Sequence, residues 1–236
     1  MDWATHRAHL LSSPAREGLA QLAHEIAPGS LAIRVRRLGG GLATSTHSVD
    51  LQSKARKVLR VVLKRYRAED RTSLLEWDRL SFARGLSVPS PEPLALDVSG
   101  EWFGTPALVM SRLPGRACVL PKHLDPSLEQ MATALVKIQD RTVSQAPAAL
   151  RRPHLVENWK PPSDLRRSEI VKRAIGHGDF HPGNLLWSRE QLTGVIDWSS
   201  ARIGPRAYEV AYCRADLTVL IGADAAERFR QIYERV

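Results

Sequence analysis

A polar loop next to a short predicted hairpin constrains this chain more than any other feature. The loop reads His177-Gly178-Asp179-Phe180-His181-Pro182-Gly183-Asn184. Apolar stretches at 185–187 and 194–196 follow it, and Asp197 comes directly after the second stretch. Two short apolar runs around a polar turn predict a β-hairpin. The hairpin would return Asp197 to the side of Asn184, so two carboxylates and an amide are expected in one small region.

The residue types in this region suit phosphoryl transfer. Asp179 and Asn184 have the spacing of the catalytic aspartate and the metal-binding asparagine in the protein-kinase loop H-R-D-x-x-x-x-N. In that loop the aspartate accepts or orients the hydroxyl proton, and the amide oxygen is a hard ligand for Mg²⁺. The pattern predicts Asp179 as the catalytic residue, with Asn184 and Asp197 as metal ligands. In an alternative interpretation, Asp179 and Asn184 only cap a turn, but that interpretation does not explain the presence of Asp197.

The segment HGDFHPGNLL followed by VIDW resembles the paired motifs of the aminoglycoside phosphotransferase and choline kinase superfamily. The resemblance runs from about residue 31 to about residue 220 and includes the segment ALVMSRLPG. It implies that Lys64, at the end of an apolar strand, contacts the α- and β-phosphates of ATP and pairs with Glu76. It also implies that the backbone of Val109, Met110 and Ser111 binds adenine.

Other interpretations of these nucleotide-site residues remain open from sequence. Lys64 has basic neighbours that are ordinary surface charges, and Glu76 is also compatible with an exposed helix position. Gly40 and Gly41 lie in a turn between two predicted strands and are candidate nucleotide-binding residues. That turn lacks the third glycine of G-x-G-x-x-G, which is a weak signal even when complete.

The predicted elements, together with the resemblance, favour an α+β protein with a kinase-like, two-lobed fold. Residues 1–113 are expected to form a nucleotide-binding lobe of antiparallel strands with helices, and residues 114–236 a mainly helical catalytic and substrate-binding lobe, with ATP between them. The periodicity predicts helices at 15–26, 72–82, 126–140, 206–220 and from 223 onward, and strands at 31–35, 58–63, 94–96 and 107–110. Ser12 or Ser13 and Asp125 are the expected helix caps. Residues 144–170 are expected to be irregular or to contain one short helix. The chain ends sooner after Asp197 than the resemblance implies, which predicts a compact or truncated substrate-binding region.

The composition sets limits on other functions. A formal net charge of +9 would suit a polyanion partner, but the basic residues form no long run and no nucleic-acid motif is present. The two cysteines lack metal-binding spacing and are expected to be inert. We found neither a secretory segment nor a run of apolar residues long enough to cross a membrane. The sequence therefore predicts a cytoplasmic protein with neither nucleic-acid nor membrane partners.

The predicted function is transfer of the γ-phosphoryl group of Mg²⁺·ATP to a hydroxyl of a small molecule. The alternatives are a non-catalytic nucleotide-binding kinase-like module and, less favoured, a basic nucleic-acid-binding protein. Few residues separate Asp197 from the helix at 206, too few for the peptide-binding activation segment of protein kinases.

Trp198 is expected in the core, and His177 is expected to orient the loop, whereas His181 is either scaffold or site residue. Glu209, Asp216 and Asp224 are either solvated helix charges or groups that favour a cationic acceptor. The sequence leaves open which hydroxyl compound accepts the group, whether GTP replaces ATP, and the oligomeric state.

Overall fold

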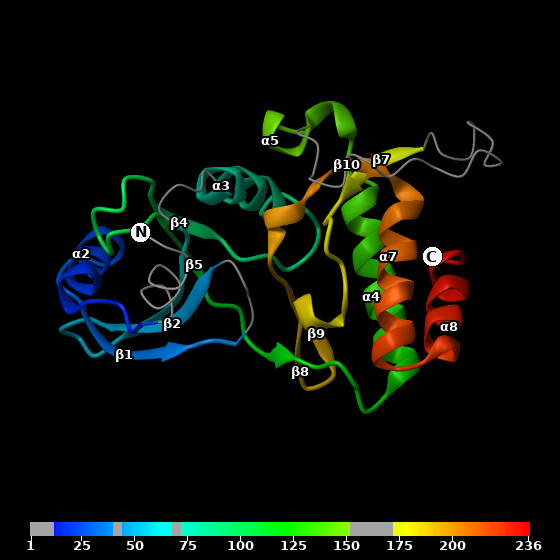
Figure 1. Cartoon of the computed structure of the whole chain (residues 1–236). Helices are drawn as coiled ribbons and strands as arrows, with labels where there is room; N and C mark the ends of the chain where they lie inside the picture. Colours follow the sequence, from blue (N-terminus) through cyan, green and yellow to red (C-terminus); the bar gives the residue numbers. More distant parts are fainter. Residues whose placement is uncertain (1–11, 40–43, 68–71, 152–171) are drawn as a thin grey trace. The chain divides into compact units, whose positions relative to one another are not determined.

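The chain forms two compact units, as seen in a computed structural model that describes residues 12–39, 44–67, 72–151 and 172–236 (Figure 1). Unit 1 comprises residues 1–77 and 92–112, and unit 2 comprises residues 78–91 and 113–236. Unit 1 carries an antiparallel sheet and unit 2 is mainly helical, so the expected α+β class is confirmed. The roles predicted for residues 1–113 and 114–236 stay predictions.

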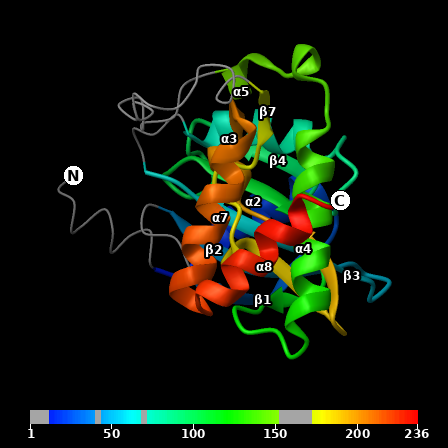
Figure 2. The same cartoon turned by 90° about the vertical axis from the view of Figure 1, so that its right-hand side faces the viewer.

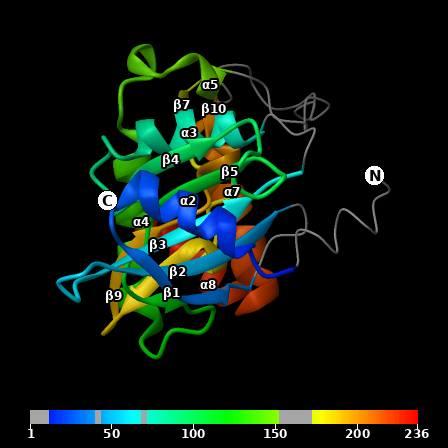
Figure 3. The ribbon, with the colours of Figure 1, turned by 90° about the vertical axis from the view of Figure 1, so that its left-hand side faces the viewer.

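Unit 1 is built on a five-stranded antiparallel sheet with the order β1-β2-β3-β5-β4. The strands are β1 (Leu31–Arg37), β2 (Ser45–Gln52), β3 (Val58–Arg65), β4 (Pro93–Asp97) and β5 (Ala107–Ser111). Helix α2 (Arg16–Ile26) lies across this sheet (Figure 3) and buries Leu19 and Leu22 against Val61 and Leu63. Side chains alternate between the faces of a strand, so Lys64 points to the face opposite α2. The apolar core on one face of the sheet therefore fixes strand β3, which carries Lys64 on the opposite face.

Unit 2 packs three helices beside two small sheets. Helices α4 (Leu124–Gln139), α7 (Arg206–Leu220) and α8 (Ala223–Tyr233) lie side by side (Figure 2). One sheet has the order β6-β8-β9, and the other pairs β10 with β7. These strands are β6 (Arg116–Ala117), β7 (Arg173–Gly176), β8 (Leu185–Ser188), β9 (Gln191–Val195) and β10 (Arg202–Pro205). The apolar stripe predicted on α4 is buried, as is Trp198.

Several local expectations are corrected. Helix α2 begins at Arg16, and its N-cap is Ala15 without a side-chain hydrogen bond, so the predicted serine cap is wrong. Helix α4 begins at Leu124, which places the predicted cap Asp125 inside the first turn. A carboxylate there still interacts favourably with the positive end of the helix dipole. Strands β6, β7 and β10 were not predicted, because they are short and pair with segments distant in the sequence.

The remaining elements follow the sequence pattern closely. Helix α3 (Thr72–Ala83) ends one residue beyond its predicted end, and the two predicted strands β4 and β5 pair antiparallel. Asp97 stabilises the connection between them, because its carboxylate accepts backbone N–H groups of the following residues. In the segment expected to be irregular, a 3₁₀ turn at Val143–Gln145 and helix α5 (Ala148–Arg151) are described, and residues 152–170 lie outside the described part.

Candidate active site

The polar loop 177–184 connects β7 to β8 and ends in a 3₁₀ turn at Pro182–Asn184. Strands β8 and β9 form the predicted hairpin, with Leu185 opposite Val195. The N–H of Ile196 donates to the carbonyl of Asn184 at 2.9 Å. This bond joins the end of the loop to the residue before Asp197. The predicted return of the chain to Asn184 is therefore confirmed.

Both oxygens of the Asp179 carboxylate accept hydrogen bonds. Asn184 Nδ2 donates to Oδ2 at 2.9 Å and also to the Asp179 carbonyl at 2.9 Å. The hydroxyl of Tyr212, on α7, donates to Oδ1 at 2.7 Å. The side chain of Asp179 is 31% exposed, so it is held firmly and still accessible to a ligand. This combination suits a carboxylate that orients the hydroxyl of an acceptor.

Asn184 and Asp197, the predicted Mg²⁺ ligands, carry hard oxygen atoms of the kind that this ion prefers. Nδ2 of Asn184 is committed to Asp179, and no group in the described ranges donates to its Oδ1. Asp197 has left-handed backbone angles, φ 63° and ψ 63°, and its Oδ1 accepts from the Ser199 hydroxyl at 2.8 Å. Such angles are unfavourable for a residue with a side chain and are often found at functional sites. Mg²⁺ binds few protein carboxylates and completes its shell with water and phosphate oxygens. The described residues contain no cluster of three or more His, Cys, Asp or Glu side chains suited to a metal.

His177 braces the loop from within the core. It is fully buried, and its Nε2 lies 3.0 Å from the carbonyl of Ile196, to which a neutral ring donates. Burial lowers the pKa of His177 to about 4, although the carboxylates of Asp197 and Asp179 act in the opposite direction. The ring packs edge-on against Trp198 at a centroid distance of 4.7 Å. The prediction that His177 orients the loop by hydrogen bonding is confirmed.

His181 caps the final turn of the loop and also lies close to the carboxylate of Asp179. Its Nδ1 accepts from the N–H of Gly183 at 3.2 Å, which caps the 3₁₀ turn. A neutral ring then carries its proton on Nε2, which lies 3.8 Å from Asp179 Oδ2. Asp216, one of the candidate acceptor-binding carboxylates, lies 4.0 Å from Nδ1. Asp224, another candidate, is exposed in the first turn of α8.

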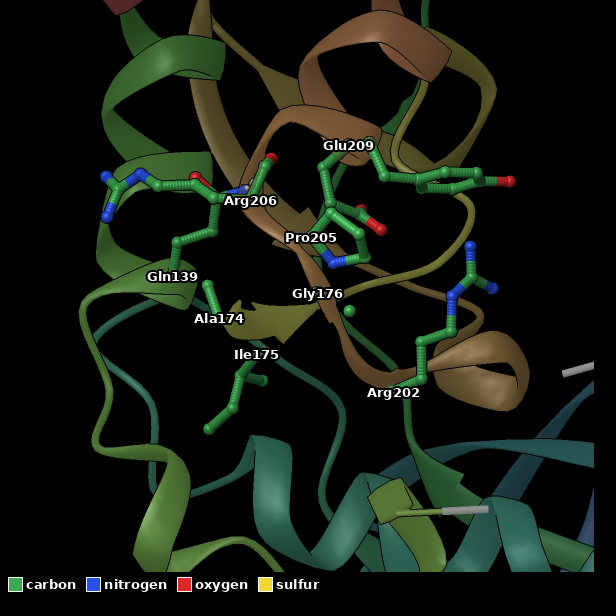
Figure 4. Close-up of a pocket in the computed structure, with 10 residues that line it drawn as sticks. Gln139, Ala174, Ile175, Gly176, Arg202, Pro205, Arg206 and Glu209 are labelled. Atoms are coloured by element: carbon green, nitrogen blue, oxygen red, sulfur yellow. Dashed lines mark hydrogen bonds between the residues drawn. The ribbon is translucent and has the colours of Figure 1, made fainter. Parts of the chain in front are cut away.

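Glu209 is tied to the loop and is neither a solvated helix charge nor free for an acceptor. Both of its carboxylate oxygens lie 3.0 Å from the backbone nitrogen of Gly178. Figure 4 shows Glu209 of α7 close to Gly176 of β7, where an added Cβ would come within 2.6 Å of Oε1. Gly178 has φ +83°, and a Cβ there would collide with the Ser200 carbonyl. Burial raises the pKa of Glu209, although the N–H of Gly178 and the charge of Arg202 oppose the shift. The sequence did contain a signal, because Glu209 shares a buried helix stripe with Cys213 and Leu217.

Tyr212 is the functional candidate that the sequence analysis missed. Its ring stacks on that of Tyr208, one helical turn earlier, at a centroid distance of 6.0 Å and an interplanar angle of 19°. Burial and the neighbouring Asp179 raise the pKa of Tyr212, so the phenol remains a hydrogen-bond donor at neutral pH. Tyr208, Tyr212 and Asp216 recur at intervals of four on α7, which was the available signal.

In unit 1, Lys64 and Glu76 form the expected ion pair. Lys64 Nζ lies 2.8 Å from both oxygens of Glu76, and the Tyr66 hydroxyl donates to Oε2 at 2.7 Å. Glu76 is only 2% exposed, which excludes the alternative that it is an ordinary surface residue. A buried carboxylate with these donors fixes the direction of the lysine ammonium group. The contact of Lys64 with a nucleotide stays a prediction.

The other predicted nucleotide contacts have a less direct structural basis. Val109 and Met110 lie inside β5, which pairs with β3 on one side and β4 on the other, so the sheet uses their peptide groups. Ser111 donates its N–H to the Glu92 carbonyl at 2.8 Å, and its hydroxyl accepts from the Glu92 N–H. The contact of this backbone with adenine stays a prediction. Gly40 and Gly41 lie outside the described residues.

Comparison with known families is consistent with this geometry. The sequence matches the model of the phosphotransferase enzyme family over residues 34–170 and 163–236, which together include the loop, the hairpin and Lys64. The chain belongs to this family. No curated protein matches the sequence at a significant level. Among the described residues, no helix is both long enough and apolar enough to cross a membrane.

Solved structures show the same fold at low sequence identity. A putative aminoglycoside phosphotransferase from Ralstonia eutropha has a TM-score of 0.68 at 15% identity, covering 94% of this chain and 80% of that chain. The macrolide 2′-phosphotransferase of Brachybacterium faecium has a TM-score of 0.66 at 15% identity, covering 93% and 82%. APH(2″)-IIa, solved in a ternary complex with streptomycin and ATP, has a TM-score of 0.63 at 14% identity, covering 95% and 83%. These similarities establish the kinase-like fold for this phosphotransferase.

Proposed function

We propose that this member of the phosphotransferase enzyme family transfers the γ-phosphoryl group of Mg²⁺·ATP to a hydroxyl of a small molecule. The arrangement of Asp179, Asn184 and Asp197 carries the proposal, because the loop holds Asp179 and Asn184 in one hydrogen-bonded unit and the end of the hairpin returns to Asn184 just before Asp197. Similar folds solved with streptomycin and ATP, or with hygromycin B and ADP, support the choice of nucleotide and acceptor class.

In this mechanism the residues of the loop act on the acceptor. The acceptor hydroxyl donates to Asp179, which directs its oxygen toward the γ-phosphorus and takes up the proton as the new P–O bond forms. The bond between the γ-phosphorus and the bridging oxygen of ADP breaks in the same transfer, and ADP leaves with that oxygen. Asn184 Oδ1 and Asp197 would hold Mg²⁺, which neutralises charge on the phosphates when bound. Lys64, fixed by Glu76, would contact the phosphates from unit 1. His177 and Glu209 keep the loop backbone in place.

The short connection after Asp197 supports a small-molecule acceptor. A 3₁₀ turn at Trp198–Ser200 and strand β10 lead directly into α7 at Arg206. Arg79 donates to the carbonyls of Ser199 and Ala149, which ties this connection to α5. The peptide-binding activation segment of protein kinases has no counterpart in this connection.

The test is a turnover screen with Mg²⁺·ATP and a panel containing streptomycin, hygromycin B, a macrolide, choline, homoserine and simple sugars. We expect ADP release that depends on one class of acceptor, with labelled phosphate transferred to it. Asp179→Ala should abolish turnover and leave nucleotide affinity nearly unchanged, because the carboxylate acts on the acceptor. Labelling of generic proteins without any small molecule would contradict the proposal. Nucleotide binding without any transfer would favour a non-catalytic binding module.

A further inference from the structure

The Asp179 carboxylate is held by two different elements. Asn184 belongs to the same loop and fixes Oδ2, whereas Tyr212 belongs to α7 and fixes Oδ1. Rotation about the Cβ–Cγ bond of an aspartate has a broad energy minimum. With the hydrogen bond from Asn184 alone, the carboxylate of Asp179 would keep some of this rotational freedom. The second hydrogen bond, from a separate element, removes that freedom. The orientation of the carboxylate therefore depends on the phenol of Tyr212.

The phenol itself is held in place. The ring of Tyr208 stacks on that of Tyr212, and the guanidinium of Arg202 lies 4.4 Å from the centroid of the Tyr208 ring. Tyr208 makes no hydrogen bond through its hydroxyl within the described ranges. The two tyrosines therefore share a helix, a stacking contact and partial burial, but only Tyr212 reaches the catalytic carboxylate.

We propose that Tyr212 is a positioning residue, which aims Asp179 at the acceptor hydroxyl by holding Oδ1 while leaving one lone pair of that oxygen free. A carboxylate oxygen accepts two hydrogen bonds, so the phenol and the acceptor hydroxyl can occupy Oδ1 together. The inference rests on the proposed function, because it assigns Asp179 the role of orienting an acceptor. It adds a residue on α7, outside the loop motif, on which the rate of transfer depends.

Tyr212→Phe tests this assignment, since it removes the hydroxyl and keeps the stacked ring. Transfer from Mg²⁺·ATP to the panel acceptor used fastest by the wild type is measured, together with phosphate release with water as acceptor. We expect kcat to fall about 10- to 100-fold, because small losses of alignment are costly. The KM for Mg²⁺·ATP and the melting temperature should hardly change. Tyr208→Phe is the matched control and should retain wild-type kcat.

A double-mutant cycle separates positioning from a structural role. If Tyr212 acts through Asp179, adding Tyr212→Phe to Asp179→Asn should cause no further loss of the residual rate. An equal additional loss in that background, or wild-type kcat in Tyr212→Phe, would overturn the inference while leaving the proposed function intact. Absence of phosphoryl transfer by the wild type, to any panel compound or to water, would overturn both.

Discussion

Replacing Glu209 with glutamine should lower turnover and should change how the free energy of unfolding depends on pH. The substitution keeps the shape of the side chain and removes its charge. The N–H of Gly178 keeps one acceptor oxygen, but the new amide group is a donor facing the backbone donors of the loop. A hydrogen bond to a neutral acceptor is about half as strong as one to a charged group. We therefore expect kcat to fall by about 3- to 10-fold as the loop loosens.

The stability effect depends on pH, because burial raises the pKa of the Glu209 carboxyl above its ordinary value of 4.5. Well below pH 4.5 the group is protonated in both the folded and the unfolded chain. As pH rises, the unfolded chain loses this proton first, so ionisation progressively favours unfolding until the folded carboxyl also ionises. The wild type should thus lose stability relative to Glu209→Gln through this window, by at most about 1.4 kcal/mol per pH unit.

Urea unfolding of both proteins at intervals between pH 5 and pH 8 measures this difference. Glu129→Gln on α4 is the control, because Glu129 is exposed and has no ion pair or hydrogen bond within the described residues. Its stability profile should parallel that of the wild type. Parallel profiles for Glu209→Gln and wild type would refute the raised pKa. Wild-type kcat in Glu209→Gln would refute the coupling of this carboxylate to the loop.

Two further substitutions test the nucleotide side of the proposal. Asp197→Ala should weaken ATP binding in the presence of Mg²⁺ by at least about 10-fold and leave metal-free binding unchanged, since it removes a charged metal ligand. Calorimetry with equal Mg²⁺·ATP affinities in mutant and wild type would exclude that role. Lys64→Met should raise the KM for ATP and lower kcat, because the phosphates lose the lysine ammonium group. In this variant the buried carboxylate of Glu76 also lacks its cationic partner. A wild-type rate profile in this variant would show that the ion pair is only structural.

Local patterns in the sequence were sufficient to predict much of the fold and the loop. The apolar stripe of α4 and the β8–β9 hairpin are encoded by short-range periodicity, which directly reports the buried face of an element. The spacing of Asp179 and Asn184 was informative because both lie in one short loop, where sequence separation limits spatial separation. The ion pair of Lys64 and Glu76 was accessible only through the family resemblance, since nothing local joins the strand to the helix.

The predictions that failed concern helix caps and short strands, whose partners are decided by tertiary packing. The expected caps Ser13 and Asp125 are chemically suitable, but each helix start also depends on tertiary packing, which shifts an end by one or two residues. Strand β7 is short and pairs with β10, about thirty positions later in the sequence, so local β-propensity does not reveal it. Pairings of this kind are visible only once the fold is known.

The supporting residues of the candidate site were difficult to predict for the same reason. Glu209 and Tyr212 are three positions apart on α7, so they project from adjacent parts of one helix surface. Glu209 contacts the loop backbone at Gly178, and Tyr212 contacts the side chain of Asp179. A single rigid helix therefore sets both the path of the loop and the direction of its carboxylate. In the proposed mechanism the loop supplies the reactive groups, and their alignment depends on the packing of α7 against it. We therefore expect the rate of transfer to depend on the stability of unit 2.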